Sequence, residues 1–319
     1  MKKILILLMV VAGFYSCSQM DQREKEIAAI DVDLEVKRFD LAFAAAGQND
    51  LPVLKEQFPY LFPAQFADSV WYKRMEDTLQ QELLIEVSNK FSGFDSQTNT
   101  LETLFKHVHY YFPNLTIPDV VTVTSDVDYR NRVIYADSLL LIGLDNYLGA
   151  DHRFYEGIQQ YIRKNLEPER IPVDVAEQVA LRLVSGPENR SFLAKVIYFG
   201  KLHYLMQQLL PEASGAAVMG YTENEFAWVQ ANESEIWRYF IDRDLLFSTD
   251  SKLDQRFLNP APFSKFYLEL DHDSPGRVGR YIGWQIVSAY MENNEVSLQQ
   301  MLGEPAEKIF NDSRFKPLK

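Results

Sequence analysis

Apolar residues recur at helical spacing along most of this chain, and one segment stands out. Residues 192–210 (FLAKVIYFGKLHYLMQQLL) place apolar side chains on nearly every face of a helix. A helix that is apolar all round is surrounded by protein, and the polar residues in this one make it unsuited to span a bilayer. The pattern predicts a buried central helix. Further helices are expected over residues 70–91, 101–111, 154–165, 173–184, 223–242, 277–292 and 298–311.

Strand-like segments are few, and most of them lie close together. Residues 34–39 alternate apolar and polar positions, which is the period of a half-buried strand. Three β-branched or aliphatic runs follow at 120–124, 132–135 and 139–142. Short strands so close in sequence favour an antiparallel sheet. The sequence therefore predicts an α+β fold that is mainly α-helical, with a small antiparallel sheet at about residues 120–142 before the central helix.

The N-terminus has the layout of a processing signal. Lys2 and Lys3 precede an apolar run at residues 4–14, and the only cysteine, Cys17, follows where cleavage is expected. The residues FYSC at 14–17 resemble a relaxed bacterial lipobox, in which the cysteine becomes the acylated first residue. The alternative is an ordinary cleaved signal with an incidental cysteine. We expect a lipoprotein signal peptide at 1–16, a polar tether at 17–33 and a single domain at 34–319.

Composition and charge exclude some classes of protein. The chain is 47% apolar and 13% aromatic, as expected of a globular protein. Its net charge of −13 becomes −15 once Lys2 and Lys3 are removed with the signal peptide. An acidic surface of this kind repels nucleic-acid phosphates, so we expect no nucleic-acid partner. Without a cysteine pair, the core must hold the fold together.

No recognised catalytic motif is present. The sequence lacks H-E-x-x-H, G-x-S-x-G, the phosphate-binding G-x-x-x-x-G-K-[ST] and the dinucleotide-binding G-x-G-x-x-G. No two histidines have the four-residue helical spacing that lets both imidazoles meet one metal. We therefore expect no metal and no cofactor, and we favour structural or surface roles for the histidines at positions 107, 109, 152, 203 and 272.

Two groups of charged residues are candidates for a site. Glu225, Glu233 and Glu235 form either a functional cluster or, as we favour, a solvated helix face. Arg277 and Arg280 lie in a glycine-rich loop before a helix, where they can clamp a carboxylate. That carboxylate belongs either to a ligand or to the acidic helix at Glu233 and Glu235, and the internal ion pair is the favoured interpretation.

Six blocks follow one another between residues 104 and 291: LFKHVHYYFPNLTIPDVVTVTSDVDY, VIYADSLLLIGLDNYLGADHRFY, VIYFGKLHYL, MGYTENEFAWVQANESEIWRYFI, LLFSTDSKLDQRF and APFSKFYLELDHDSPGRVGRYIGWQIVSAYM. Their ordered series, together with the lipobox cysteine, resembles the gliding motility-associated lipoprotein B (GldB) family of the Bacteroidetes. The resemblance implies a cell-envelope lipoprotein of the gliding machinery, linked to type IX secretion. It transfers no catalytic residues, because the family has none established.

The family is also remotely similar to zincin-like metallopeptidases, which carry H-E-x-x-H on the central helix. On this chain the motif falls at Tyr198, Phe199 and Leu202, which offer neither a metal ligand nor a general base. The resemblance thus implies a degenerate metallopeptidase scaffold, that is, a pseudoenzyme.

These observations predict a non-catalytic protein anchored to the membrane by an N-terminal lipid such as palmitate, which binds other envelope or motility proteins. Because no acidic run follows Cys17, we expect it at the outer membrane, facing the periplasm. Two alternatives stay open. One is a divergent zincin-like hydrolase that uses Glu225, Glu233 or Glu235. The other is a carbohydrate-capturing surface lipoprotein, which requires exposed aromatic rings around Trp71, Trp228 or Trp237.

Overall fold

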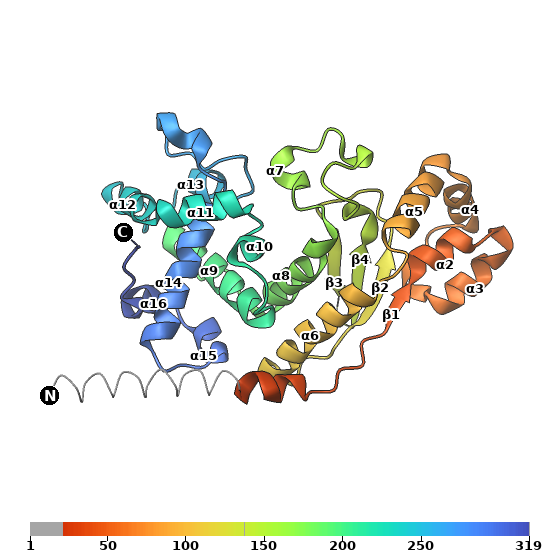
Figure 1. The fold of residues 1–319 in the computed structure, drawn as a ribbon, viewed down its shortest axis with the longest axis horizontal. Coiled ribbons are helices and arrows are strands. Elements are labelled where there is room, and N and C mark those ends of the chain that lie inside the picture. Colours follow the sequence, from red (N-terminus) through yellow and green to blue (C-terminus); the bar gives the residue numbers. More distant parts are fainter. Residues whose placement is uncertain (1–21, 137, 319) are drawn as a thin grey trace.

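The structure, a computed structural model, describes residues 22–136 and 138–318. It has the predicted α+β class, with one small sheet and many helices (Figure 1). The sheet and its covering helices occupy one half of the view, and a bundle of helices occupies the other. The chain enters the sheet half first and finishes in the helical half.

The sheet has four strands in the order β1-β2-β4-β3. Strand β1 is Val36–Arg38, β2 is Asp119–Val123, β3 is Val133–Ala136 and β4 is Leu139–Gly143. Strand β2 runs parallel to both β1 and β4, and only β3 and β4 are antiparallel. The prediction of an antiparallel sheet is therefore confirmed only for β3 and β4, and the sheet as a whole is mixed, because the connection after β2 carries the chain past the place that β4 later fills. The middle residues of β2 are buried without alternation, as in a strand covered on both faces.

Helices cover the sheet on both faces. On the outer face, α2 to α5 enclose a separate aromatic core that includes Phe43, Phe58 and Phe62 and reaches Val121 of the sheet (Figure 1). On the other face, α6 and α8 join the sheet to the main core. The helices are α2 (Phe39–Ala45), α3 (Leu51–Gln57), α4 (Asp68–Glu76), α5 (Thr78–Lys90), α6 (Asp95–Tyr111) and α8 (Ile171–Leu183).

The predicted central helix is confirmed as α9 (Phe192–Leu209), which begins at a Ser191 side-chain cap and is buried on most of its surface. It packs most extensively against α14 (Val278–Asn293), and α8 and α16 (Ala306–Ser313) also contact it. The remaining helices of the second half are α10 (Gly215–Met219), α11 (Glu223–Ala231), α12 (Glu233–Asp242), α13 (Lys252–Phe257) and α15 (Leu298–Gly303).

Four predicted helices are interrupted. The one expected at 298–311 breaks at Glu304 and Pro305, between α15 and α16. The one expected at 70–91 breaks at Asp77, whose carboxylate accepts the first-turn N–H of Gln80 at 2.8 Å and so starts α5. The one expected at 223–242 breaks at Asn232 between α11 and α12. Of the one expected at 154–165, only α7 (Gln160–Arg163) is α-helical, because Gly157 adopts a φ of 89° that ends a preceding short turn.

Part of the predicted tether is docked on the body of the protein. Residues 22–28 are helical, and Ile27 is only 2% exposed. Glu24 lies 3.3 Å from the Nε2 atom of His107 on α6. The expected signal peptide and Cys17 lie outside the described residues. Within the described part, no helix is both long and apolar enough to cross a membrane.

Candidate functional site

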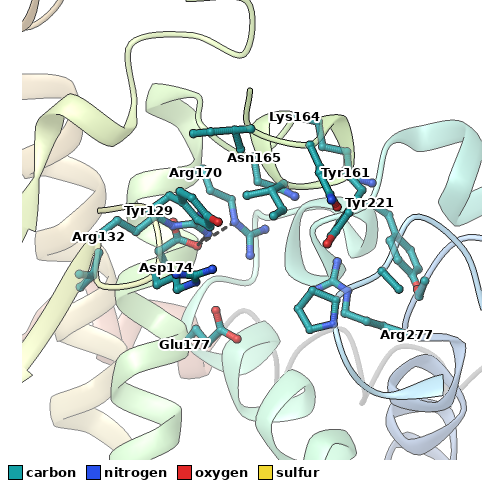
Figure 2. Close-up of a pocket in the computed structure, with 18 of the residues that line it drawn as sticks. Tyr129, Arg132, Tyr161, Lys164, Asn165, Arg170, Asp174, Glu177, Tyr221 and Arg277 are labelled. Atoms are coloured by element: carbon teal, nitrogen blue, oxygen red, sulfur yellow. Dashed lines mark hydrogen bonds and ion pairs between the residues drawn. The ribbon is translucent and has the colours of Figure 1, made fainter. Parts of the chain in front are cut away.

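A cleft of about 710 Å³ lies where α7, α8 and the start of α14 meet. Figure 2 shows side chains from these segments pointing into one space, with Arg170 and Arg277 on opposite sides of it. The sheet half supplies one wall through the segment before β3, and the helical half supplies the other through Tyr221 and residues 276–280. The cleft therefore joins the two halves of the fold.

The cleft is basic although the protein is acidic. Six cationic side chains line it against two carboxylates, which leaves a net charge of +4 at the site of a chain whose total is −13. This local excess of positive charge attracts anions, although the rest of the acidic surface repels them. The cations are Arg130, Arg132, Lys164, Arg170, Arg277 and Arg280, and the carboxylates are Asp174 and Glu177.

Asp174 fixes two of these arginines on the α8 side. It is 3% exposed, and its Oδ1 atom accepts from Arg132 Nη2 at 2.8 Å and from Arg170 Nε at 2.9 Å. The Tyr147 hydroxyl donates to Oδ2 at 2.9 Å. Burial opposes the charge of Arg132, but Asp174 outweighs that cost and raises the pKa of Arg132 above its usual range. The Arg132 and Arg170 side chains are thus held rigidly at the cleft wall.

Arg277 and Arg280 are held differently, through backbone carbonyls and aromatic rings. Arg277 Nη2 donates to Gly220 O at 3.1 Å, and Arg280 Nε donates to Leu258 O at 2.6 Å. The Arg280 guanidinium lies 3.9 Å from the centre of the Phe199 ring, a cation–π contact. Among the described residues, no carboxylate oxygen lies within 4.0 Å of either guanidinium. Their positive charge therefore remains directed at the cleft.

The pKa values of these two arginines reflect that arrangement. Burial and the charge of Arg277 lower the pKa of Arg280 to about 10. Burial also lowers the pKa of Arg277, and the charge of Arg170 acts in the same direction. Like charges that depress one another's pKa values lie close together. Arg170, Arg277 and Arg280 therefore form one cationic cluster.

The backbone supports this cluster at Gly220, the αL cap of α10. A Cβ atom built on Gly220 would lie 3.2 Å from Arg277 Nη2, 3.3 Å from Asn165 Oδ1 and 3.4 Å from Arg170 Nη1. Asn165 Nδ2 and Arg277 both donate to the Gly220 carbonyl, and Arg170 Nη1 donates to that of Ala217. One short turn thus brings Arg277 together with two side chains of the segment between α7 and α8.

Arg277 also has an unusual backbone. Its φ of 65° is left-handed, a region that residues other than glycine rarely adopt, and it is the N-cap of α14. The preceding Gly276 has no room for a side chain, because a Cβ there would lie 2.3 Å from Ala261 O. Strained backbones persist where the surrounding structure enforces them, and they are concentrated at functional sites.

The three candidate glutamates do not converge. Glu225 accepts from Thr222 N at 2.7 Å as a helix cap and pairs with Lys164. Glu233 is buried and accepts from the Tyr281 hydroxyl at 2.7 Å and from the N–H of Leu318 at 2.9 Å. Glu235 is exposed and pairs with Arg238.

The favoured internal ion pair between these glutamates and the two arginines is therefore wrong. Within the part of the chain that the structure describes, Arg277 and Arg280 form no ion pair with Glu233 or Glu235. They line the cleft instead. The other interpretation of the two arginines, namely that they hold a ligand, stays a prediction.

The positions of the degenerate metal motif have separate surroundings. Leu202 is 3% exposed in the core, and Phe199 packs beneath Arg280. Tyr198 is half-buried and lines a second cavity of about 210 Å³ beside Lys201. In the described ranges, no group of three or more His, Cys, Asp or Glu side chains is placed to hold a metal ion.

The tryptophans required by the carbohydrate alternative do not form an exposed platform. Trp71 packs edge-on against Phe62 and Phe66, and Trp237 packs against Phe310 and Phe315. Trp228 packs against the main core, and none of the three is exposed. The carbohydrate-binding alternative therefore lacks the exposed aromatic rings that it requires around these tryptophans.

Most of the cleft was missed from the sequence. One pattern in the sequence could have indicated it: Arg170, Asp174 and Glu177 lie four and three residues apart and so share one helix face. Arg132, Lys164 and Tyr221 come from other segments, and no local pattern links them. Only Arg277 and Arg280 were among the predicted candidates.

The fold and this cleft define an α+β protein with an arginine-lined cleft. The family model for the gliding motility protein GldB matches residues 20–317. The chain therefore belongs to the GldB family, a family of gliding motility-associated lipoproteins of the cell envelope. No curated protein and no solved structure matches it significantly. The expected likeness to zincin-like peptidases stays a prediction.

Proposed function

We propose that this protein is a non-catalytic binding component of the gliding and type IX secretion-associated machinery, and that it holds an anionic group of another envelope component in its arginine cleft. The observation that carries the proposal is the cluster of Arg170, Arg277 and Arg280. Guanidinium groups orient anions through paired hydrogen bonds. Because they remain protonated in proteins, they are suited to binding rather than to proton transfer.

The same proposal places the protein on a membrane through lipid at Cys17. Membership of a lipoprotein family and the FYSC sequence at 14–17 support this attachment. Two or more acyl chains at one residue give stable anchoring, whereas a single chain binds only marginally. We place the protein at the outer membrane, facing the periplasm, because no run of acidic residues follows Cys17.

The hydrolase alternative has less support. Its candidate carboxylates Glu225, Glu233 and Glu235 are engaged in three different structural contacts. Within the cleft, Asp174 is occupied by Arg132, Arg170 and Tyr147, which leaves Glu177 as the one lining carboxylate without a hydrogen-bond partner among the described residues. A general base must reach the proton that it removes, and a carboxylate enclosed by fixed donors does so poorly.

Complementation in a gliding host tests the proposal. A strain that lacks the gene is supplied with wild-type protein, Cys17→Ala, Arg280→Gln or Glu235→Gln. Single-cell gliding and colony spreading are scored, with immunoblots of membrane fractions to confirm equal protein levels. We expect wild type and Glu235→Gln to restore gliding, and Cys17→Ala and Arg280→Gln to fail. If Arg280→Gln glides normally, the cleft is not the working site. If Glu235→Gln fails while folded, the hydrolase alternative is favoured.

A further inference from the structure

The three clustered arginines present N–H donors that no group among the described residues accepts. Arg280 donates to the protein through Nε alone, and Arg277 through Nη2 alone. Arg170 donates through Nε and Nη1, which leaves its Nη2. Figure 2 shows the Arg170 and Arg277 groups facing each other across the cleft. A ligand between them would accept hydrogen bonds from several directions at once.

The charge of the cleft favours a ligand with more than one negative charge. A carboxylate would neutralise one unit of the local net charge of +4. A phosphate monoester carries about −1.5 to −2 charges at neutral pH and has three acceptor oxygens. Three acceptor oxygens match three guanidinium groups better than the two of a carboxylate do. The number and direction of the free donors therefore favour phosphate.

The start of α14 adds a further attraction. This helix has sixteen residues, and Gly276, Arg277 and Arg280 at its N-terminal end line the cleft. Aligned peptide dipoles give a helix N-terminus a partial positive charge that favours phosphate groups. The left-handed φ of Arg277 turns the chain into the helix at this point. The strained residue and the helix end thus act on the same part of the cleft.

The cleft is larger than a phosphate group alone. Its volume of about 710 Å³ is within the range of small-molecule clefts, roughly 300–1,000 Å³. Tyr129, Tyr161 and Tyr221 line the remaining space. The Tyr221 ring carries Arg277 at 5.4 Å and Lys164 at 5.8 Å from its centre. Because these two cations cover the Tyr221 ring, Tyr129 and Tyr161 are the rings that give an organic group a surface to pack against.

We propose that the cleft binds a phosphate monoester, with its phosphate held by Arg170, Arg277 and Arg280 and its esterified group against the two uncovered tyrosines. This inference rests on the proposed function for the identity of the working cleft, and it adds the chemistry of the ligand. The same chemistry occurs in a soluble ester and in a lipid headgroup, so the experiment has an arm for each.

Titration calorimetry provides the soluble arm. The full mature chain carrying Cys17→Ala, which cannot be acylated, is titrated with phenyl phosphate, inorganic phosphate and succinate. We expect saturable binding of phenyl phosphate that is at least about tenfold tighter than that of succinate, since a charged hydrogen bond contributes about 1.5–3 kcal/mol and 1.4 kcal/mol is a factor of ten. Equal affinity for succinate, or no saturable binding of phenyl phosphate, would overturn the proposal.

Variants assign the binding to the cleft. We expect Arg280→Gln to weaken phenyl phosphate binding by about tenfold or more. Arg238→Gln, which removes an exposed arginine paired with Glu235, is the matched control and should bind as wild type. If circular dichroism shows that Arg280→Gln does not fold, the affinity of Glu177→Gln for phenyl phosphate is measured instead. Glu177 is half-buried, faces the cluster and makes no hydrogen bond or ion pair among the described residues. Its neutralisation should tighten binding several-fold, and unchanged affinity would contradict the proposal.

Vesicles provide the lipid arm. Phosphatidylcholine vesicles with and without phosphatidic acid are sedimented with the same protein. Binding only in the presence of phosphatidic acid, displaced by phenyl phosphate and lost in Arg280→Gln, identifies a lipid monoester. Soluble binding without sedimentation identifies a soluble one. Failure of both arms while Arg280→Gln still abolishes gliding would reject the phosphate inference and keep the proposed function. Phosphate binding together with normal gliding of Arg280→Gln would keep the phosphate inference and reject the proposed function.

Discussion

Gly200 of α9 and Gly283 of α14 bring the two central helices into backbone contact. A Cβ atom on Gly200 would lie 2.2 Å from Gly283 O, and one on Gly283 would lie 2.0 Å from Val196 O. Phe199 and Arg280 lie beside this contact, with the guanidinium 3.9 Å from the ring centre. The close approach of the two helices therefore sets the position of an arginine in the cleft.

Gly283→Ala should destabilise the protein strongly. The added methyl group meets backbone atoms, which cannot rotate away as a side chain end can. Overpacking of a core costs about 1–3 kcal/mol, and a backbone clash places this variant at the upper end or beyond. Urea denaturation measures the loss. Gly93→Ala is the control, because nothing lies within 4 Å of its Cβ position, and it should change stability little. Equal stability of the two variants would contradict the described helix contact.

Asp174→Asn should also be costly. The substitution keeps the shape of the side chain but removes the charge that Arg132 and Arg170 share. Breaking one side of a buried ion pair costs about 3–5 kcal/mol, because the remaining charge stays buried. Asp151→Asn is the control, since its side chain is 99% exposed, and its effect should be within about 0.5 kcal/mol. Thermal and urea unfolding give both values, and a loss at Asp174 no larger than at Asp151 would contradict its anchoring role.

His203 should make the folded state sensitive to acid. It lies on α9, with its Nδ1 atom 2.7 Å from Phe199 O, and burial, followed by the charge of Arg280, lowers its pKa from 6.5 to about 3. Between these pH values the unfolded chain binds a proton that the folded protein excludes, so stability falls as the pH decreases below about 6.5. The slope contributed is at most about 1.4 kcal/mol per pH unit. Above that range the contribution of neutral His203 is complete.

The measurement compares stability at several pH values between about 6.5 and 4.5 in wild type and His203→Gln. The substitution removes the titrating group, so the variant should lose less stability on acidification than wild type does. Gly93→Ala, which changes no titrating group, is the control and should keep the wild-type slope. Identical slopes for wild type and His203→Gln would show that His203 is not excluded from protonation.

The sequence predicted the fold class and the central helix because both depend on local periodicity. It did not predict strand order, since the insertion of β4 between β2 and β3 depends on where the intervening segment travels. Asp174 illustrates the limit for the site. Its spacing from Arg170 is visible in the sequence, but Arg132 and Tyr147 reach it only through the sheet and its following turn. Arg277 and Arg280 could be identified from the sequence because they lie in a glycine-rich loop directly before a helical pattern.

Arg277 allows strain and ligand binding to be separated. Its φ of 65° costs an L residue roughly 1–2 kcal/mol, and glycine removes that cost. Arg277→Gly loses the hydrogen bond to Gly220 O, worth about 0.5–1.5 kcal/mol, so its stability should stay within about 1 kcal/mol of wild type. Arg277→Ala loses the same bond and keeps the strain, so it should be about 1 kcal/mol less stable than Arg277→Gly. Both should bind phenyl phosphate at least about tenfold more weakly than wild type. Urea denaturation and calorimetry on the pair give the two readouts. A glycine variant less stable than the alanine variant would refute the strain, and wild-type affinity in both would remove Arg277 from the binding site.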